Sequence, residues 1–135
     1  MTDLEFVLRA VDRLWSEGIR AWVCGGWGDE LRGLALPRPH GDLDLLYPAR
    51  DWRRVDRLDL DWTPGKPVPW KRAFELDGSP VELYLVERDE HGWFTRRANR
   101  RHDWPEDVFA THGRIAVAST AALAGFRRAH RRAAA

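Results

Sequence analysis

The chain has one cysteine, Cys24, among its 135 residues, which excludes an intrachain disulfide and a zinc site built from several cysteines. Long apolar runs are also missing: residues 115–118 form a run of four, whereas about 20 are needed to cross a bilayer. Residues 1–5 contain two acids and no basic side chain, so they lack the positive region of a secretory signal. These absences predict a cytoplasmic protein without membrane contact.

Neither sign of charge is in large excess, because 22 lysines and arginines face 21 aspartates and glutamates, for a net charge of +1. A protein that binds nucleic acid independently of sequence usually carries a large basic excess, so we expect no bulk nucleic-acid binding. Lysine is scarce, since only Lys66 and Lys71 accompany twenty arginines. Arginine favours bidentate contacts with phosphate or carboxylate, and a GC-rich coding sequence gives the same bias.

One domain accounts for the length and composition. A mass of 15.6 kDa leaves no room for two independent cores, and a hydrophobic fraction of 44% is sufficient for one. We expect a single domain over residues 1–130 and a frayed tail over residues 131–135.

The hydrophobic spacing predicts helices and strands in mixed order. Helices are expected over residues 3–17, 29–34, 49–58 and 119–130. Strands are expected over residues 19–24, 42–47, 70–76, 80–87, 92–95 and 114–118. Residues 59–69 and 96–112 read as irregular segments, and Asp77-Gly78 predicts a hairpin turn. The order predicts the α/β class, with a mixed sheet flanked by helices.

Two glycines, Gly25 and Gly26, stand between a predicted strand and a predicted helix. Glycine lets the backbone turn sharply and approach a ligand closely. The N–H groups of a following helix can bind phosphate. An ordinary tight turn gives the same pattern, so the residues alone leave both interpretations open.

Two acids, Asp42 and Asp44, alternate along a predicted strand and therefore point to the same face. Like charges side by side need a counter-charge, and carboxylate oxygens suit Mg²⁺. Glu82 lies on another predicted strand that could pair beside the first. Three such carboxylates could hold two metal ions and activate a hydroxyl for attack on phosphorus. A solvated acidic surface is the alternative for each of them.

A basic cluster follows the predicted hairpin strands and contains Arg96, Arg97, Arg100, Arg101 and His102. Such a cluster could bind a triphosphate or an RNA end. The alternative is a solvated loop, which is the more common origin of such a cluster.

The Gly-Gly-Trp of residues 25–27, followed by the Arg-x-His-x-Asp-x-Asp of residues 38–44, resembles the signature of the small antibiotic nucleotidyltransferases, the lincosamide and aminoglycoside type. These belong to the DNA polymerase beta-like nucleotidyltransferase superfamily. Together with the later strand carboxylate, the similarity spans residues 22–84. The third carboxylate here is a glutamate rather than the commoner aspartate.

The resemblance implies a minimal nucleotidyltransferase fold that transfers a nucleoside monophosphate from an NTP to a hydroxyl of a small molecule, an aminoglycoside- or lincosamide-like acceptor. It implies a set of catalytic, metal-binding residues and a set of nucleotide-binding residues. The first set, which would hold one or two Mg²⁺, is Asp42, Asp44 and Glu82; the second is Gly25, Gly26, Arg38 and His40. Glu82 would be a metal ligand or the general base.

Two other functions fit the same resemblance. One is a nucleotidyltransferase of the toxin–antitoxin type that modifies protein or RNA, and the other is a non-catalytic nucleotide-binding module. The sequence leaves a homodimer open.

Overall fold

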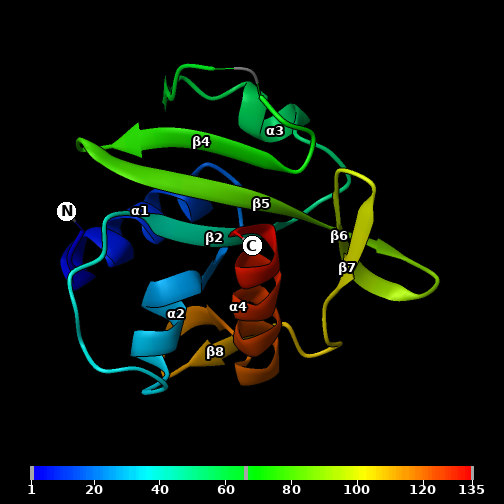
Figure 1. Cartoon of the computed structure of the whole chain (residues 1–135). Coiled ribbons are helices and arrows are strands. Elements are labelled where there is room, and N and C mark those ends of the chain that lie inside the picture. The colour runs from blue at the N-terminus through cyan, green and yellow to red at the C-terminus, as the bar shows by residue number, and fades with distance from the viewer. Residues whose placement is uncertain (1, 66, 135) are drawn as a thin grey trace.

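The computed structural model describes residues 2–65 and 67–134 and shows a mixed sheet with helices on both faces (Figure 1). The helices are α1 (Leu4–Ser16), α2 (Gly25–Leu31), α3 (Arg53–Asp56) and α4 (Thr120–Ala134). The strands are β1 (Trp22–Cys24), β2 (Leu43–Pro48), β3 (Asp61–Trp62), β4 (Lys71–Leu76), β5 (Ser79–Asp89), β6 (Gly92–Arg97), β7 (Arg100–Asp103), β8 (Phe109–His112) and β9 (Ile115–Ala118).

The strands of the described residues form one connected sheet in the order β3-β4-β5-β2-β1-β9-β8, and β6 and β7 extend from β5. Strand β2 runs parallel to β5 and antiparallel to β1, and β1 runs parallel to β9. This mixture confirms the predicted α/β class with a mixed sheet. Within the part of the chain that the structure describes, no helix is long and apolar enough to span a bilayer.

Helix α1 covers one face of the sheet. Its N-cap is Asp3, whose carboxylate accepts a 2.7 Å hydrogen bond from the backbone N–H of Phe6. The chain leaves the helix at Gly18, where a φ of +82° suits glycine. The buried face of α1 belongs to the same core as Leu43 and Leu45 of β2. That face consists of Phe6, Val7, Ala10, Val11 and Leu14.

Helix α4 covers the opposite face, where its Phe126 packs in a second core with Leu46 of β2 and Tyr84 of β5. Successive residues of a strand point to opposite faces. Because Leu43 and Leu45 face α1, Asp44 and Leu46 face α4. The carboxylate of Asp44 therefore lies on the face that α4 covers.

The observed elements differ from the expected ones in their bounds. Helix α2 begins directly at Gly25, so both glycines lie in its first turn. Helix α3 has only four residues; an Asx turn precedes it, in which the carboxylate of Asp51 accepts a hydrogen bond from the N–H of Arg53. Strands β7 and β8 occupy a segment expected to be irregular, where pairing with β6 and β9 decides the conformation.

Helix α4 continues to Ala134, past the expected end at residue 130. The frayed ending expected over residues 131–135 stays a prediction, and residue 135 lies outside the described residues.

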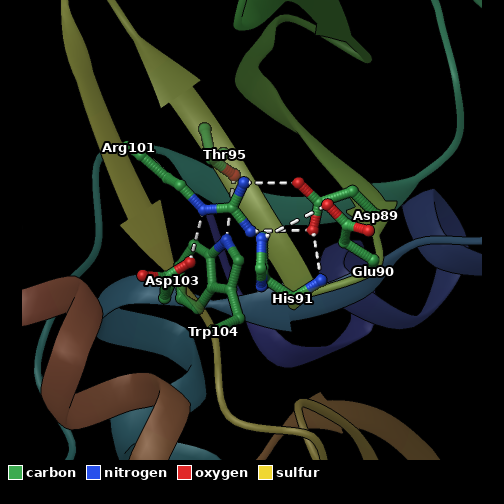
Figure 2. Close-up of polar contacts among 7 residues, drawn as sticks. All are labelled: Asp89, Glu90, His91, Thr95, Arg101, Asp103 and Trp104. Atoms are coloured by element: carbon green, nitrogen blue, oxygen red, sulfur yellow. Dashed lines mark hydrogen bonds and ion pairs between the residues drawn. The ribbon is translucent and has the colours of Figure 1, made fainter.

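The β6–β7 hairpin is fixed to the end of β5 by one arginine (Figure 2). Arg101 donates hydrogen bonds of 2.6 Å to the carboxylates of both Asp89 and Asp103. Next to it, the indole N–H of Trp104 donates a 2.9 Å hydrogen bond to the hydroxyl of Thr95. Side-chain hydrogen bonds thus connect β6 and β7 with the end of β5.

Arg101→Gln is expected to destabilise the protein near neutral pH and to lose this effect in acid. Hydrogen bonds from Arg101 hold the pKa of Asp89 well below its ordinary value. A carboxylate with a lowered pKa in the folded state adds stability above its unfolded pKa of about 4, and this stability is lost as the pH falls below it. Melting curves should show the largest difference from wild type near pH 7 and a shrinking one below about pH 4.

Asp89→Asn is the matched control, because it removes the same charge pair from the other side and should flatten the pH dependence in the same window. A difference independent of pH would show that Arg101 acts by packing instead, since its guanidinium lies 3.9 Å from the ring centroid of Phe94.

Candidate active site

Three carboxylates meet where β2 and β5 run side by side. Asp44 and Glu82 are direct partners in the parallel register, and Asp42 immediately precedes Leu43, the first residue of β2. One carboxylate oxygen from each of the three lies within 4.8 Å of the others. The structure therefore brings together the three acids that the sequence indicates.

The carboxyl group of Asp44 is held in an environment that disfavours its charge. Burial, and then repulsion by Asp42 and Glu82, raises the pKa of Asp44 to about 8. Its Oδ1 atom is buried and has no hydrogen-bond partner among the described residues. An unpaired buried carboxylate oxygen is costly, and a cation would satisfy it. The three carboxylates therefore fit a divalent ion such as Mg²⁺, which prefers charged oxygen ligands.

The carboxylate of Glu82 is held from both sides. The hydroxyl of Tyr84 donates a 2.9 Å hydrogen bond to its Oε2, and the ammonium of Lys71 lies 3.4 Å from its Oε1. Tyr84 is buried, and its hydroxyl lies 3.5 Å from Nε2 of His130 on α4. These neighbours fix the direction in which Glu82 points.

Tyr84→Phe is expected to weaken Mn²⁺ binding, with Mn²⁺ used as a spectroscopic substitute for Mg²⁺, by roughly 10- to 100-fold. The variant removes the hydrogen bond to Glu82 but keeps the ring against Phe126, whose centroid is 5.4 Å away. The melting temperature should therefore change little. Electron paramagnetic resonance titration measures the affinity.

The matched control is Tyr47→Phe, because Tyr47 belongs to the core on the α1 face. It should bind Mn²⁺ as wild type does. Equal Mn²⁺ affinities for the two variants would show that Tyr84 does not orient Glu82.

Gly25 brings the backbone directly against Asp44. Its φ is +64°, and a Cβ atom placed there would lie 2.6 Å from Oδ2 of Asp44. Cys24, the residue before it, pairs with Asp44 across β1 and β2. Only glycine therefore meets both requirements of this turn, the left-handed conformation and the close approach.

Gly26 lies against two of the other residues that the resemblance implies. A Cβ atom there would lie 2.6 Å from Nη2 of Arg38 and 2.8 Å from Nδ1 of His40. The ring of His40 is buried, 3.0 Å from Oε1 of Glu30 and with its centroid 4.5 Å from that of Trp27. The buried ring of His40 thus packs against the turn at Gly26, whereas Arg38 is exposed. The structure brings these three residues together; their contact with a nucleotide stays a prediction.

Sequence reasoning assigned no role at the site to Lys71 or Tyr84. Tyr84 follows Glu82 by two residues on a strand, which places both side chains on one face. Lys71 could be found from the hairpin turn at Asp77 and Gly78. Pairing the two strands residue by residue from this turn brings Lys71 opposite Tyr84. It also missed the ion pair of Asp29 on α2 with Arg127 on α4.

No protein-family model and no curated protein sequence matches this chain. Among solved structures, it is similar to lincosamide antibiotic adenylyltransferase LnuA, lincomycin-bound, at 15% identity and a TM-score of 0.73, over 93% of this chain and 85% of that chain. The chain has the fold of the nucleotidyltransferases.

Two more structures of the nucleotidyltransferase fold are similar to this chain. ANT(2'')-Ia in complex with adenylyl-2''-tobramycin matches at 18% identity and a TM-score of 0.61, over 94% of this chain and 76% of that chain. A proposed nucleotidyltransferase from Thermotoga maritima matches at 22% identity and a TM-score of 0.54, over 99% and 91%. At these identities the likeness shows the fold, and it confirms the fold that the resemblance implied.

Proposed function

We propose that this chain is a Mg²⁺-dependent enzyme that transfers a nucleoside monophosphate from an NTP to a hydroxyl of a small molecule. The observation that carries the proposal is the cluster of Asp42, Asp44 and Glu82, with the unsatisfied Oδ1 of Asp44, on a nucleotidyltransferase fold. Similarity to lincomycin-bound LnuA and to ANT(2'')-Ia with adenylyl-2''-tobramycin supports an acceptor of the lincosamide or aminoglycoside kind.

The metal would be held by Asp42, Asp44 and Glu82. When bound, Mg²⁺ supplies positive charge at the transferred phosphorus, worth several kcal/mol of transition-state stabilisation. The NTP would lie with its phosphates at Gly25 and Gly26, where the missing side chains allow close approach. The exposed guanidinium of Arg38 would donate hydrogen bonds to phosphate oxygens from the same side.

Transfer forms a bond between the acceptor oxygen and the α-phosphorus and breaks the bond from that phosphorus to the oxygen bridging the β-phosphate. Pyrophosphate leaves with the bonding electrons. The proton of the acceptor hydroxyl would go to a carboxylate, and Glu82 is the residue that we propose for this role. Glu82, Lys71 and Trp62 line an open cavity of about 530 Å³, a volume that suits a small molecule.

The test is pyrophosphate release with each of the four NTPs, Mg²⁺, and a panel of lincosamides and aminoglycosides. Release that depends on acceptor and disappears in Asp42→Asn, but not in the control Asp61→Asn on exposed β3, supports the proposal. Labelled nucleotide that enters only protein or RNA would replace it with the toxin–antitoxin type. Nucleotide binding without release on any acceptor would replace it with a non-catalytic module.

A further inference from the structure

One row of paired residues crosses four strands at the candidate active site. Asp44 of β2 is paired with Cys24 of β1 on one side and with Glu82 of β5 on the other. Glu82 is in turn opposite Ala73 of β4. Gly25 follows Cys24, and β4 is the strand beyond β5, so Gly25 and β4 lie at opposite ends of the row. In-line transfer places the attacking and leaving oxygens on opposite sides of phosphorus. With the phosphates at Gly25, the acceptor therefore lies on the side of β4.

Strand β4 carries Lys71 on the same face as Glu82. Lys71 precedes Ala73 by two residues, so the two side chains point to one face of the sheet. In the register Lys71 is opposite Tyr84, which makes it a diagonal neighbour of Glu82. Its ammonium lies 3.4 Å from Oε1 of Glu82. Within the part of the chain that the structure describes, this is the one ion pair that any of the three acids forms.

The ammonium of Lys71 has donors left for a bound molecule. It carries three N–H groups, and among the described residues only Glu82 accepts a hydrogen bond from it. The side chains are 33% exposed for Lys71 and 25% exposed for Glu82, and both line the open cavity of about 530 Å³. Ala73 lines the same cavity, and its small side chain leaves room beside Glu82. A group that donates and a group that accepts thus face one cavity side by side.

The other charged side chains among the described residues of this cavity are paired with each other. Arg72 donates hydrogen bonds of 2.9 and 3.3 Å to the carboxylate of Asp56. Its guanidinium also lies 4.7 Å from the ring centroid of Trp52. The cavity therefore offers a bound molecule a pattern of one donor and one acceptor rather than a net charge.

Two oxygens on neighbouring carbons of a ring match this pattern. They are separated by about the length of a hydrogen bond, so one hydroxyl can donate to Glu82 while its neighbour accepts from Lys71. An ammonium in the neighbouring position has donors only and cannot accept from Lys71. It also brings a like charge close to the lysine, which is unfavourable.

We propose that Lys71 determines which hydroxyl of the acceptor reacts. The reacting hydroxyl is one whose neighbouring ring carbon carries a second oxygen, and Lys71 donates a hydrogen bond to that oxygen while the hydroxyl reaches Glu82. A hydroxyl whose ring neighbours carry ammonium groups is rejected. The inference rests on the proposed function, because it takes the cavity beside Glu82 as the place of the acceptor.

The experiment measures acceptor binding by calorimetry with Mg²⁺ and without NTP. Kanamycin B and lincomycin are the diol probes, since each has a sugar ring with adjacent hydroxyls. Dibekacin is the matched probe, because it differs from kanamycin B only in lacking two adjacent ring hydroxyls. The variant is Lys71→Met, and the control is Arg57→Met, an exposed arginine outside the cavity and without an ion pair among the described residues.

At least one diol probe should bind wild type and control equally and bind Lys71→Met at least about tenfold more weakly. Dibekacin should bind all three proteins alike. Lys71→Arg keeps a donor at this position and should recover part of the affinity for the diol probe. The melting temperature of Lys71→Met should change little, because the side chain is partly exposed.

Mn²⁺ titration separates this role from a role in metal binding. Lys71→Met removes a positive charge beside the three carboxylates, so Mn²⁺ should bind the variant at least as tightly as the wild type. Weaker Mn²⁺ binding would assign Lys71 to the support of the metal site and overturn the proposal.

Equal affinity of wild type and Lys71→Met for both diol probes overturns the proposal, as does an equal loss of dibekacin binding. Pyrophosphate release that requires Asp42 but is unchanged in Lys71→Met removes this inference and leaves the proposed function standing. Diol binding that depends on Lys71, without pyrophosphate release from any NTP, defeats the proposed function and leaves the diol site standing.

Discussion

Asp44→Asn should lower pyrophosphate release by at least about a thousandfold and, at the same time, stabilise the metal-free protein. The amide keeps the shape of the side chain, so Leu43 and Leu45 stay packed in the core on the other face. It removes one charged oxygen from the metal-binding cluster, and Mg²⁺ prefers charged oxygens. A loss of about 4 kcal/mol of transition-state stabilisation corresponds to the thousandfold change.

The stability of the same variant should depend on pH in a defined direction. The folded protein holds the pKa of Asp44 at about 8, above its value of about 4 in the unfolded chain. The folded state therefore binds the proton more tightly, and the wild type loses stability as the pH rises from about 4 to 8. Asparagine has no group that titrates in this pH range. The free energy of unfolding of the variant should therefore exceed that of the wild type by roughly 1–3 kcal/mol at pH 8.

Melting without metal and pyrophosphate release with Mg²⁺ are measured on the same preparations, with Asp61→Asn as the control. Full turnover of Asp44→Asn would exclude Asp44 as an essential ligand. Loss of the cooperative melting transition in Asp44→Asn would show that Asp44 is needed for folding.

Gly25→Ala should abolish metal binding and destabilise the protein together. Alanine at a φ of +64° costs about 1–2 kcal/mol. Its Cβ would lie 2.6 Å from Oδ2 of Asp44, so the carboxylate must leave its place in the cluster. Mn²⁺ titration and thermal melting measure the two effects.

The matched control is Gly33→Ala. Gly33 has a φ of +72°, but a Cβ atom there meets nothing within 4 Å. The two variants should share the loss caused by the backbone conformation, and only Gly25→Ala should lose Mn²⁺. Normal Mn²⁺ binding by Gly25→Ala would show that the turn does not position Asp44.

The acids of the candidate site could be found from the sequence because their signal is local. Asp42 and Asp44 alternate with leucines, and the alternation alone places them on one face. Their meeting with Glu82 required a pairing of β2 with β5, which the sequence offered as a possibility without fixing its direction or register. The order of strands in a sheet is a long-range property, and no short window of sequence contains it.

The segment from residue 96 to residue 112 could not be predicted for the same reason. Four arginines and few apolar residues give it no period of two, so it reads as a loop. Its strands form because β6 and β9 offer hydrogen-bond partners, and because Arg101 finds carboxylates on both sides. The start of α2 at Gly25 was missed because glycine is a poor helix former, and close approach to Asp44 overrides that preference.

The position of β1 has a consequence for the order in which the protein folds. Strand β1 pairs with β2 early in the chain, but its other edge is closed by β9, where Val23 meets Val117. Contacts between segments far apart in sequence form slowly, because a long loop must close first. Until residues 115–118 arrive, β1 is an open edge, and the turn at Gly25 that covers Asp44 is supported from one side only. During synthesis, Asp42, Asp44 and Glu82 are therefore present before the sheet that positions them is complete. The arrangement of the candidate site is complete only after β9 has paired with β1.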